Sequence, residues 1–250
     1  MAKAKRSHME STPIVHPPDR RVFRIMAFGD SNTFGTASVA APPSFRLATE
    51  DRWPRVMQSC LVEAEVIDEG LPGRTTDLED PEEPVQGGVS YSGARHLPTA
   101  LASHQPLDLV ILMLGTNDAK TRFTREAHDI AAGMRRLVST VKSFQSIMGY
   151  TAPSVLVISP PAIASSVVNG RFVEMFARGS QLTAALPHLY QEVAGEFGVD
   201  FIDANNIIRT DGIDGVHWSA TAHRTFGTTV ASWIGSRYGL ELADDSRSPR

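Results

Sequence analysis

Short apolar runs alternate along the chain with longer segments in which apolar residues recur every three or four positions. The runs predict five strands, at residues 22–28, 65–68, 107–114, 155–159 and 199–202. The third run is apolar at nearly every position, which is typical of a central parallel strand that is covered on both faces. Alternating strands and helices predict a doubly wound parallel sheet. In such sheets, ligands bind at the carboxyl ends of the strands.

Two of the intervening segments show clear helical faces. The first face is formed by Ile130, Met134, Leu137, Val138, Val141 and Phe144, and the second by Leu182, Leu186, Leu189, Val193 and Phe197. Pro187 interrupts the second pattern and predicts either a kink or the start of a new helix, because proline cannot donate the backbone hydrogen bond. Ser219 is expected to be the N-cap of a last helix that ends at about Arg237.

These elements fit one domain, which we place at residues 21–240. Residues 1–20 contain three prolines and no periodicity, so they are predicted to be a disordered arm, and residues 241–250 a flexible tail. The string at residues 6–9 (RSHM) is also compatible with an expression-vector remnant. No internal repeat or second domain is visible.

Polar turns at strand ends contain the candidate chemistry. A hydroxyl nucleophile needs a base to accept its proton, and the base needs an anion that fixes its tautomer. Ser31 follows the first strand, and His217 lies near the C-terminus with Asp214 three residues before it. We therefore predict Ser31 as nucleophile, His217 as base and Asp214 as the orienting acid. Asp211 is the alternative acid.

Four sequence blocks carry a family resemblance. They are Gly29-Asp30-Ser31, Gly73 within residues 68–76, Gly115-Thr116-Asn117-Asp118, and Asp214 to His217. In this order they resemble the SGNH (GDSL-type) hydrolases, a family of serine esterases, lipases and acyltransferases. The resemblance implies a flavodoxin-like three-layer α/β/α sandwich with a central five-stranded parallel sheet. It also implies an oxyanion hole formed by Ser31, Gly73 and Asn117, while Asp30 and Asp118 organise loops.

Residues 69–77 and the strand leading into Gly115 look like the bacterial arylesterase and acyltransferase subgroup. That resemblance implies hydrolysis of short-chain acyl or aryl esters through an acyl-enzyme, which is released to water or to an alcohol. Acyl transfer and perhydrolysis with peroxide are expected side activities, and a carbohydrate or glycan acetyl esterase is the competing function. Phe34 and Trp53 are candidates to line the acyl pocket, although core packing explains Trp53 equally well.

Two functions of other classes deserve comparison. Asp30, Asp118 and Asp203 faintly resemble the ligands of a metallophosphoesterase, but that chemistry needs several histidine ligands beside the carboxylates. The turn at residues 31–36 after the first strand also suits a flavodoxin-like module that binds phosphate or flavin. That interpretation leaves the Asp214–His217 turn unexplained. We therefore expect no metal and no cofactor.

Composition gives no support for a nucleic-acid or membrane partner. The chain has 24 basic and 28 acidic residues, which gives no electrostatic case for nucleic acid. No run approaches the roughly 20 apolar residues that cross a bilayer. Lone Cys60 excludes an intramolecular disulfide, and no secretory signal is visible, so we expect a cytoplasmic protein.

Two long loops, at 36–50 and 77–93, suggest interfaces, and the resemblance implies a homo-oligomer.

Overall fold

The computed structural model of this chain describes residues 22–39, 45–82, 88–165 and 170–243. The predicted arm at residues 1–20 lies outside these ranges, as do residues 244–250 of the predicted tail. Residues 241–243 belong to the packed domain, because Leu242 forms an antiparallel bridge with Leu61 and the Ala243 amide donates to the Cys60 carbonyl. The domain thus extends three residues beyond the expected boundary at 240.

Five parallel strands form the central sheet, in the order β2-β1-β3-β4-β5. They are β1 (Phe23–Gly29), β2 (Ala64–Gly70), β3 (Leu109–Met113), β4 (Ser154–Ser159) and β5 (Asp200–Asp203). Each matches a predicted strand to within two residues at either end. The apolar runs are clearest for β3 and β4, which are buried on both faces, whereas the edge strands β2 and β5 are only partly buried.

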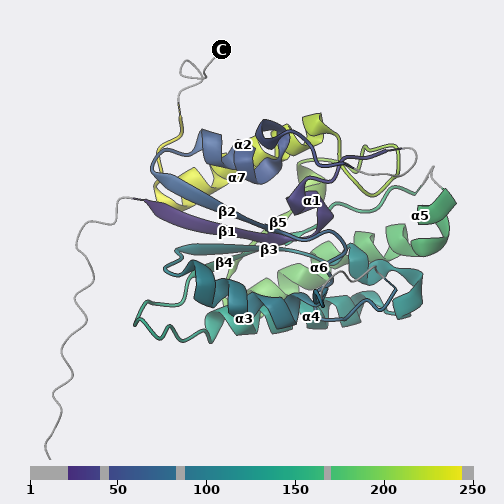
Figure 1. The fold of residues 1–250 in the computed structure, drawn as a ribbon, viewed down its shortest axis with the longest axis horizontal. Coiled ribbons are helices and arrows are strands. Elements are labelled where there is room, and N and C mark those ends of the chain that lie inside the picture. Colours follow the sequence, from purple (N-terminus) through teal and green to yellow (C-terminus); the bar gives the residue numbers. More distant parts are fainter. Residues whose placement is uncertain (1–21, 40–44, 83–87, 166–169, 244–250) are drawn as a thin grey trace, which may run out of the picture.

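Helices cover both faces of the sheet, which confirms the predicted α/β class (Figure 1). One face carries α2 (Trp53–Cys60) and α7 (Ala220–Tyr238), and the other carries α3 (Gly93–His104), α4 (Ala127–Lys142) and α6 (Gly179–Phe197). Successive side chains of a strand point to opposite faces. In β3, Leu109 and Ile111 therefore join the core under α2 and α7, whereas Val110 and Leu112 join the opposite core.

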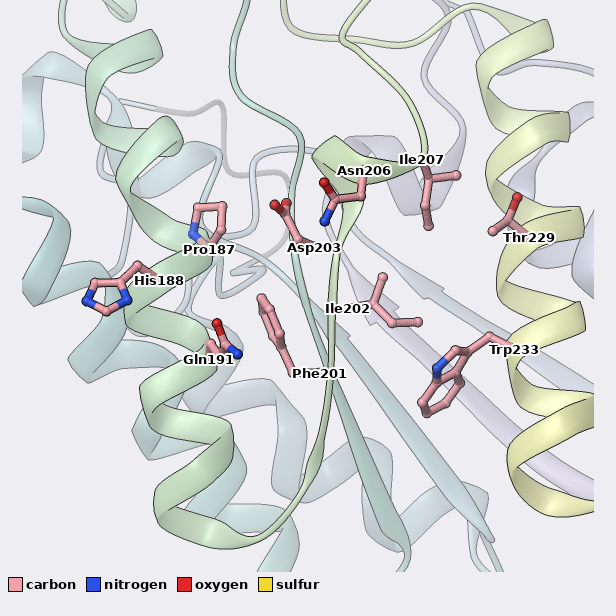
Figure 2. A pocket seen from close by; sticks show the side chains of 10 residues that line it. All are labelled: Pro187, His188, Gln191, Phe201, Ile202, Asp203, Asn206, Ile207, Thr229 and Trp233. Carbon is pink, nitrogen blue, oxygen red and sulfur yellow. The ribbon is translucent and has the colours of Figure 1, made fainter.

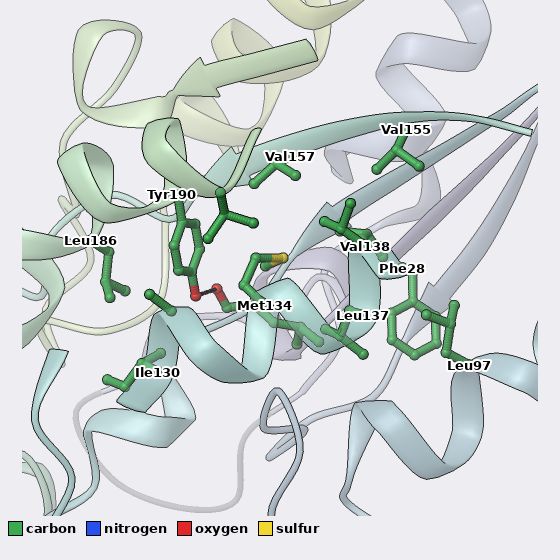
Figure 3. Close-up of a cluster of buried hydrophobic side chains, with 14 of the residues drawn as sticks. Phe28, Leu97, Ile130, Met134, Leu137, Val138, Val155, Val157, Leu186 and Tyr190 are labelled. Carbon is green, nitrogen blue, oxygen red and sulfur yellow. Dashed lines mark hydrogen bonds between the residues drawn. The ribbon is translucent and has the colours of Figure 1, made fainter. Parts of the chain in front are cut away.

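The larger core lies between the sheet and α3, α4 and α6 (Figure 3). Its helical contacts include Ile130, Met134 and Leu137 from the face predicted for α4. Tyr190 of α6 is wholly buried there, and its hydroxyl donates to the Leu114 carbonyl at 3.0 Å. The core therefore contacts the chain directly before Gly115, at the carboxyl end of β3.

The structure confirms the predicted N-cap of the last helix and shows that Pro187 does not begin a new one. Ser219 caps α7, because its hydroxyl accepts a hydrogen bond from the Ala222 amide. Pro187, by contrast, lies inside α6, which runs unbroken from Gly179 to Phe197, so no new helix begins there. The packing of Leu182, Leu186 and Val193 in the core outweighs the one hydrogen bond that proline cannot make.

Short elements follow the strands at the carboxyl edge of the sheet or precede the longer helices. They are α1 (Ser31–Phe34), η1 (Thr49–Asp51), η2 (Asn117–Ala119), η3 (Thr121–Phe123), α5 (Gly170–Met175) and η4 (Ala204–Asn206). Among the residues that the structure describes, no helix is both long enough and apolar enough to cross a membrane.

Candidate active site

Ser31 stands at the turn that joins β1 to α1. The Asp30 carboxylate is the N-cap of α1, because it accepts a hydrogen bond from the Asn32 amide at 3.0 Å. Gly35 ends the helix with a φ of 86°, a left-handed conformation that favours glycine. A single turn of helix therefore holds the Ser31 hydroxyl at the carboxyl edge of the sheet.

The loop before α7 places an acid and an imidazole opposite this serine. One oxygen of Asp214 accepts from the amides of Val216 and His217, at 3.0 and 2.8 Å, and the turn between them needs Gly215 at a φ of 73°. The other oxygen lies 2.8 Å from His217 Nδ1. His217 Nε2 lies 3.1 Å from Ser31 Oγ. The three side chains thus form one continuous hydrogen-bonded series.

The alternative acid, Asp211, does not contact the imidazole. Its carboxylate accepts hydrogen bonds from the amide and the hydroxyl of Ser219, at the start of α7. Asp211 therefore anchors the helix that follows the loop, and Asp214 is the acid that touches His217. The spacing of three residues allows this contact, because one aspartate can bind both the backbone and the ring of a residue three positions later.

Burial and charge suit this series for proton transfer. Ser31, His217 and Asp214 expose only 6%, 7% and 1% of their surface. Burial by itself raises the pKa of Asp214, but hydrogen bonds and charge from His217 outweigh it and lower the pKa to about 2. Asp214 is therefore ionised near neutral pH and holds the proton of His217 on Nδ1, which leaves Nε2 free to accept from the Ser31 hydroxyl.

Asn117 and Gly73 come together beside the serine turn. Asn117 begins η2, and its side-chain amide donates to the Arg74 carbonyl at 3.1 Å, which keeps Asn117 next to the Gly73–Arg74 segment. Gly73 has a φ of 88°. Within the described ranges, the backbone amides of Ser31 and Gly73 have no hydrogen-bond acceptor. These free donors and the second N–H of Asn117 are the groups that a developing oxyanion requires.

Asp30 and Asp118 are buried in the surrounding turns. Asp118 accepts from the Thr76 amide and hydroxyl and pairs with Arg125 at 2.8 Å. Burial raises the pKa of Asp118, and it raises the pKa of Asp30 to about 6 despite the hydrogen bond from Asn32. Both carboxylates tie loops together, and neither contacts the Ser31 hydroxyl.

The two aromatic pocket candidates have different surroundings. Trp53 is wholly buried between the sheet and α7, with its ring edge-on to Phe226 at 5.3 Å. It is a core residue, which corrects its assignment to the acyl pocket; packing accounts for it because α2 and α7 meet at this ring. Phe34 is partly exposed beside the Ser31 turn, and the Arg46 guanidinium lies over its ring at 3.9 Å from the ring centre.

Three residues that contact or support the candidate site were not predicted from the sequence. Phe172 of α5 lies edge-on to the His217 ring at 6.0 Å. Tyr190 fixes the chain before Gly115, and Arg74 is almost wholly buried behind the Gly73 turn. Arg74 lies within residues 68–76, one of the four blocks that carry the family resemblance, and this position was the only hint in the sequence. The carbonyls that it binds belong to Gly29 of β1 and Glu69 of β2. For Phe172 and Tyr190, periodicity predicts at most core packing.

A groove of about 600 Å³ lies between α6, β5 and α7 (Figure 2), and Ser31 and His217 are not among the residues that line it. Its lining includes Phe201, Trp233 and Asp203, the third carboxylate of the metal alternative. Asp203 accepts hydrogen bonds from Ser159 and Asn205 instead of facing Asp30 or Asp118. Across the described ranges, no three histidine, cysteine or acidic side chains are placed to hold a metal ion. The metallophosphoesterase alternative therefore has no ligand set in this part of the chain.

Comparisons with known proteins agree with the geometry. A family described as "GDSL-like Lipase/Acylhydrolase family" matches residues 27–225. An aryl esterase from M. smegmatis is 42% identical over 86% of this chain and 99% of its own, with a TM-score of 0.81. Est24, a carbohydrate acetylesterase from Sinorhizobium meliloti, is 39% identical over the same shares of the two chains, also with a TM-score of 0.81. No protein with curated annotation matches significantly.

Proposed function

Since the chain belongs to the GDSL-like lipase/acylhydrolase (SGNH) family and is therefore an esterase of that class, we propose that it hydrolyses esters through an acyl-enzyme formed on Ser31. The observation that supports this most directly is the hydrogen-bonded series Ser31–His217–Asp214, with distances of 3.1 and 2.8 Å. A serine alkoxide is not available at neutral pH without a base at this distance.

The proposed first half-reaction follows from the positions of the atoms. Ser31 Oγ attacks the ester carbonyl carbon while His217 Nε2 accepts the hydroxyl proton, and Asp214 stabilises the imidazolium that forms. The carbonyl oxygen becomes an oxyanion and receives hydrogen bonds from the Ser31 amide, the Gly73 amide and the Asn117 side chain. His217 then donates its proton to the leaving alkoxide as the carbon–oxygen bond breaks.

In the second half-reaction, water or an alcohol attacks the acyl-enzyme. His217 again accepts the proton of the attacking hydroxyl, and the tetrahedral intermediate collapses to release Ser31 with its proton restored. Water gives the free acid, whereas an alcohol gives a new ester and hydrogen peroxide gives a peracid. The same residues therefore serve hydrolysis, acyl transfer and perhydrolysis, and the acceptor decides the product.

We propose short-chain acyl or aryl esters as the substrates. The nearly buried Ser31 and the aromatic rings of Phe34 and Phe172 near it favour a small acyl group over a long one. The similarity to the M. smegmatis aryl esterase supports an aryl or simple alkyl leaving group. A carbohydrate acetyl esterase is the second candidate, because the Sinorhizobium meliloti enzyme is nearly as similar.

A series of p-nitrophenyl esters with two to twelve acyl carbons, assayed with and without an alcohol acceptor, tests this substrate class. We expect the rate to be highest for acetate or butyrate and to fall sharply for longer chains. Acetylated sugars in the same assay separate the two candidates, since a carbohydrate acetyl esterase would prefer them to p-nitrophenyl acetate. A yellow, flavin-containing protein without esterase activity would instead favour the flavodoxin-like alternative.

A further inference from the structure

Arg74 is a buried cation directly behind the Gly73 amide. Its side chain exposes only 3% of its surface. A buried charge is costly unless hydrogen bonds and an opposite charge compensate for it. Burial lowers the pKa of Arg74 to about 10, and the nearby charges of Glu69 and Asp30 oppose that shift. Arg74 is thus cationic at neutral pH.

The Arg74 side chain connects the ends of two strands. Its Nη1 donates to the Gly29 carbonyl at 2.9 Å and also to the Glu69 carbonyl. Gly29 is the last residue of β1, only two positions before Ser31. The guanidinium carbon lies 4.2 Å from the centre of the Phe28 ring. A planar donor that stacks on an aromatic ring while it binds two carbonyls allows little freedom in the position of either strand end.

The Arg74 backbone provides the third connection. Its carbonyl accepts the hydrogen bond from the Asn117 side chain at 3.1 Å, and its own amide donates to the Leu71 carbonyl at 3.1 Å. The peptide before it contains Gly73. One residue therefore contacts all three segments that supply the proposed oxyanion donors: the Ser31 turn, the Gly73 turn and Asn117.

We propose that Arg74 is a positioning residue that sets the distances among the three oxyanion donors. This inference rests on the proposed esterase function. Glu69 supports Arg74 from the side: its carboxylate lies 3.7 Å from the guanidinium and is held by His96 and His104 at 3.2 and 2.9 Å. The three donors must fit the oxyanion of the tetrahedral intermediate. Displacement of an active-site group by about 1 Å can lower the catalytic rate by roughly 10²-fold.

The test compares Arg74→Lys and Arg74→Met with a matched control, Arg55→Met. Lysine keeps the charge, but its ammonium cannot bridge both carbonyls and stack on Phe28 as the guanidinium does. Arg55 also bonds β2, through the Val66 carbonyl and the Asp68 carboxylate, yet it contacts neither turn of the site. The control therefore removes a comparable arginine and leaves the oxyanion donors in place.

Three quantities are measured on each purified variant. Titration with a serine-directed phosphonate counts active sites, p-nitrophenyl acetate gives kcat and KM per active site, and a methyl trifluoromethyl ketone gives an inhibition constant. This ketone adds to the serine and places an oxyanion in the hole. For both Arg74 variants, we expect kcat to fall about 10²-fold with KM changed less than about threefold. The ketone should bind more weakly by a factor similar to the loss in kcat/KM.

Two results would overturn the proposal. In one, the Arg74 variants keep the wild-type kcat and ketone affinity. In the other, they lose titratable sites while the surviving sites behave as wild type, which indicates a purely structural role. The Arg55→Met control should match wild type in all values per active site. Failure of the esterase function is recognised separately, because wild-type protein would then show neither phosphonate labelling nor ester hydrolysis.

Discussion

Three buried carboxylates surround Ser31, and their partners give them different properties. Asp214 binds two amides and an imidazole, so its pKa falls to about 2 in spite of burial. Complete burial of Asp30 outweighs the hydrogen bond from the Asn32 amide and the smaller contributions of His217 and Thr116, and its pKa rises to about 6. Burial also raises the pKa of Asp118, which pairs with Arg125. At neutral pH the protein therefore compensates the ionised form of Asp30 less well than that of Asp214.

Replacing Asp30 tests this electrostatic cost. Its folded-state pKa, about 6, lies above the usual 3.8, so the folded chain binds the proton more tightly than the unfolded chain. Ionised Asp30 thus lowers stability above pH 6, and the loss disappears as the pH falls toward 3.8. Asp30→Asn keeps a capping oxygen and should stabilise the protein at pH 8 by up to about 3 kcal/mol.

Urea denaturation of wild type and Asp30→Asn at pH 8 and pH 5 measures the effect. The gain should be largest at pH 8 and clearly smaller at pH 5, where much of the wild-type carboxyl is protonated. An equal difference at both pH values would show that the substitution acts through the cap or the packing and not through charge.

The serine and the histidine should behave as a unit. We expect Ser31→Ala and His217→Ala each to lower kcat by roughly 10⁴–10⁶, with the double variant hardly slower than either, because both act in one proton-coupled step. Steady-state kinetics on p-nitrophenyl acetate and phosphonate labelling of each variant provide the measurement. Losses that multiply in the double variant would argue against a shared step.

At the scale of elements, α2 and α7 pack closely where α7 carries a glycine. A Cβ on Gly227 would lie 2.7 Å from the Trp53 carbonyl oxygen and 2.7 Å from Val56 Cβ. Trp53 and Phe226 meet edge-on beside this point. The absence of a side chain at Gly227 therefore allows the two helices to approach each other.

Two glycine-to-alanine substitutions separate packing from helix propensity. Gly227→Ala forces the backbone of α2 to move and should destabilise the protein by about 1–3 kcal/mol. Gly195 of α6 has open space around its Cβ position, so Gly195→Ala should stabilise by about 0.5–1 kcal/mol. Thermal unfolding should show Tm changes of opposite sign. A neutral Gly227→Ala would mean that α2 and α7 separate at little cost.

At the scale of the whole molecule, apolar side chains remain exposed on the two long loops. Phe45 of the first loop is 62% exposed and Val89 of the second is 43% exposed, whereas Val85 lies outside the described residues. Exposed apolar groups on a soluble chain often mark an interface with another subunit. We therefore propose a closed homo-oligomer in which these loops pack near a neighbour's site entrance and restrict it to small acyl groups.

Light scattering coupled to size-exclusion chromatography measures the assembly directly. We expect a mass of at least two chains at micromolar concentration, and a shift toward the monomer in a Phe45→Ser, Val89→Ser double variant. Substitution of the exposed Ile147, at 92% exposure in another loop, serves as the control and should leave the mass unchanged. A wild-type monomer with full short-chain activity would contradict the proposal.

Activity should not require a metal ion. The described residues contain no cluster of three metal-ligating side chains, and the proposed steps use only Ser31, His217, Asp214 and the oxyanion donors. We expect prolonged treatment with EDTA to leave the rate of ester hydrolysis unchanged. A loss of activity that added zinc or manganese restores would support the metallophosphoesterase alternative.

Much of the fold was predictable because its signals are local. The inner strands β1, β3 and β4 are nearly continuous apolar runs, because burial on both faces of a parallel sheet requires such runs. The edge strands β2 and β5 are only partly buried and carry shorter apolar stretches between acidic residues. The contact between Asp214 and His217 was also local, since three residues of one turn bring the two side chains together. Ser31 could be paired with them from residue chemistry and from the order of the sequence blocks, although it lies 186 residues away from His217.

Tertiary structure alone decided features that depend on packing between distant segments. Trp53 was compatible with a pocket or a core until α7 was placed against it, and Pro187 was tolerated because the buried face of α6 outweighs one missing hydrogen bond. Arg74 reaches groups on two strands and Asn117, which no periodicity encodes. The sequence by itself determined the elements and the chemical groups through local periodicity and spacing. The distances among those groups come from long-range packing, because each depends on several segments at once.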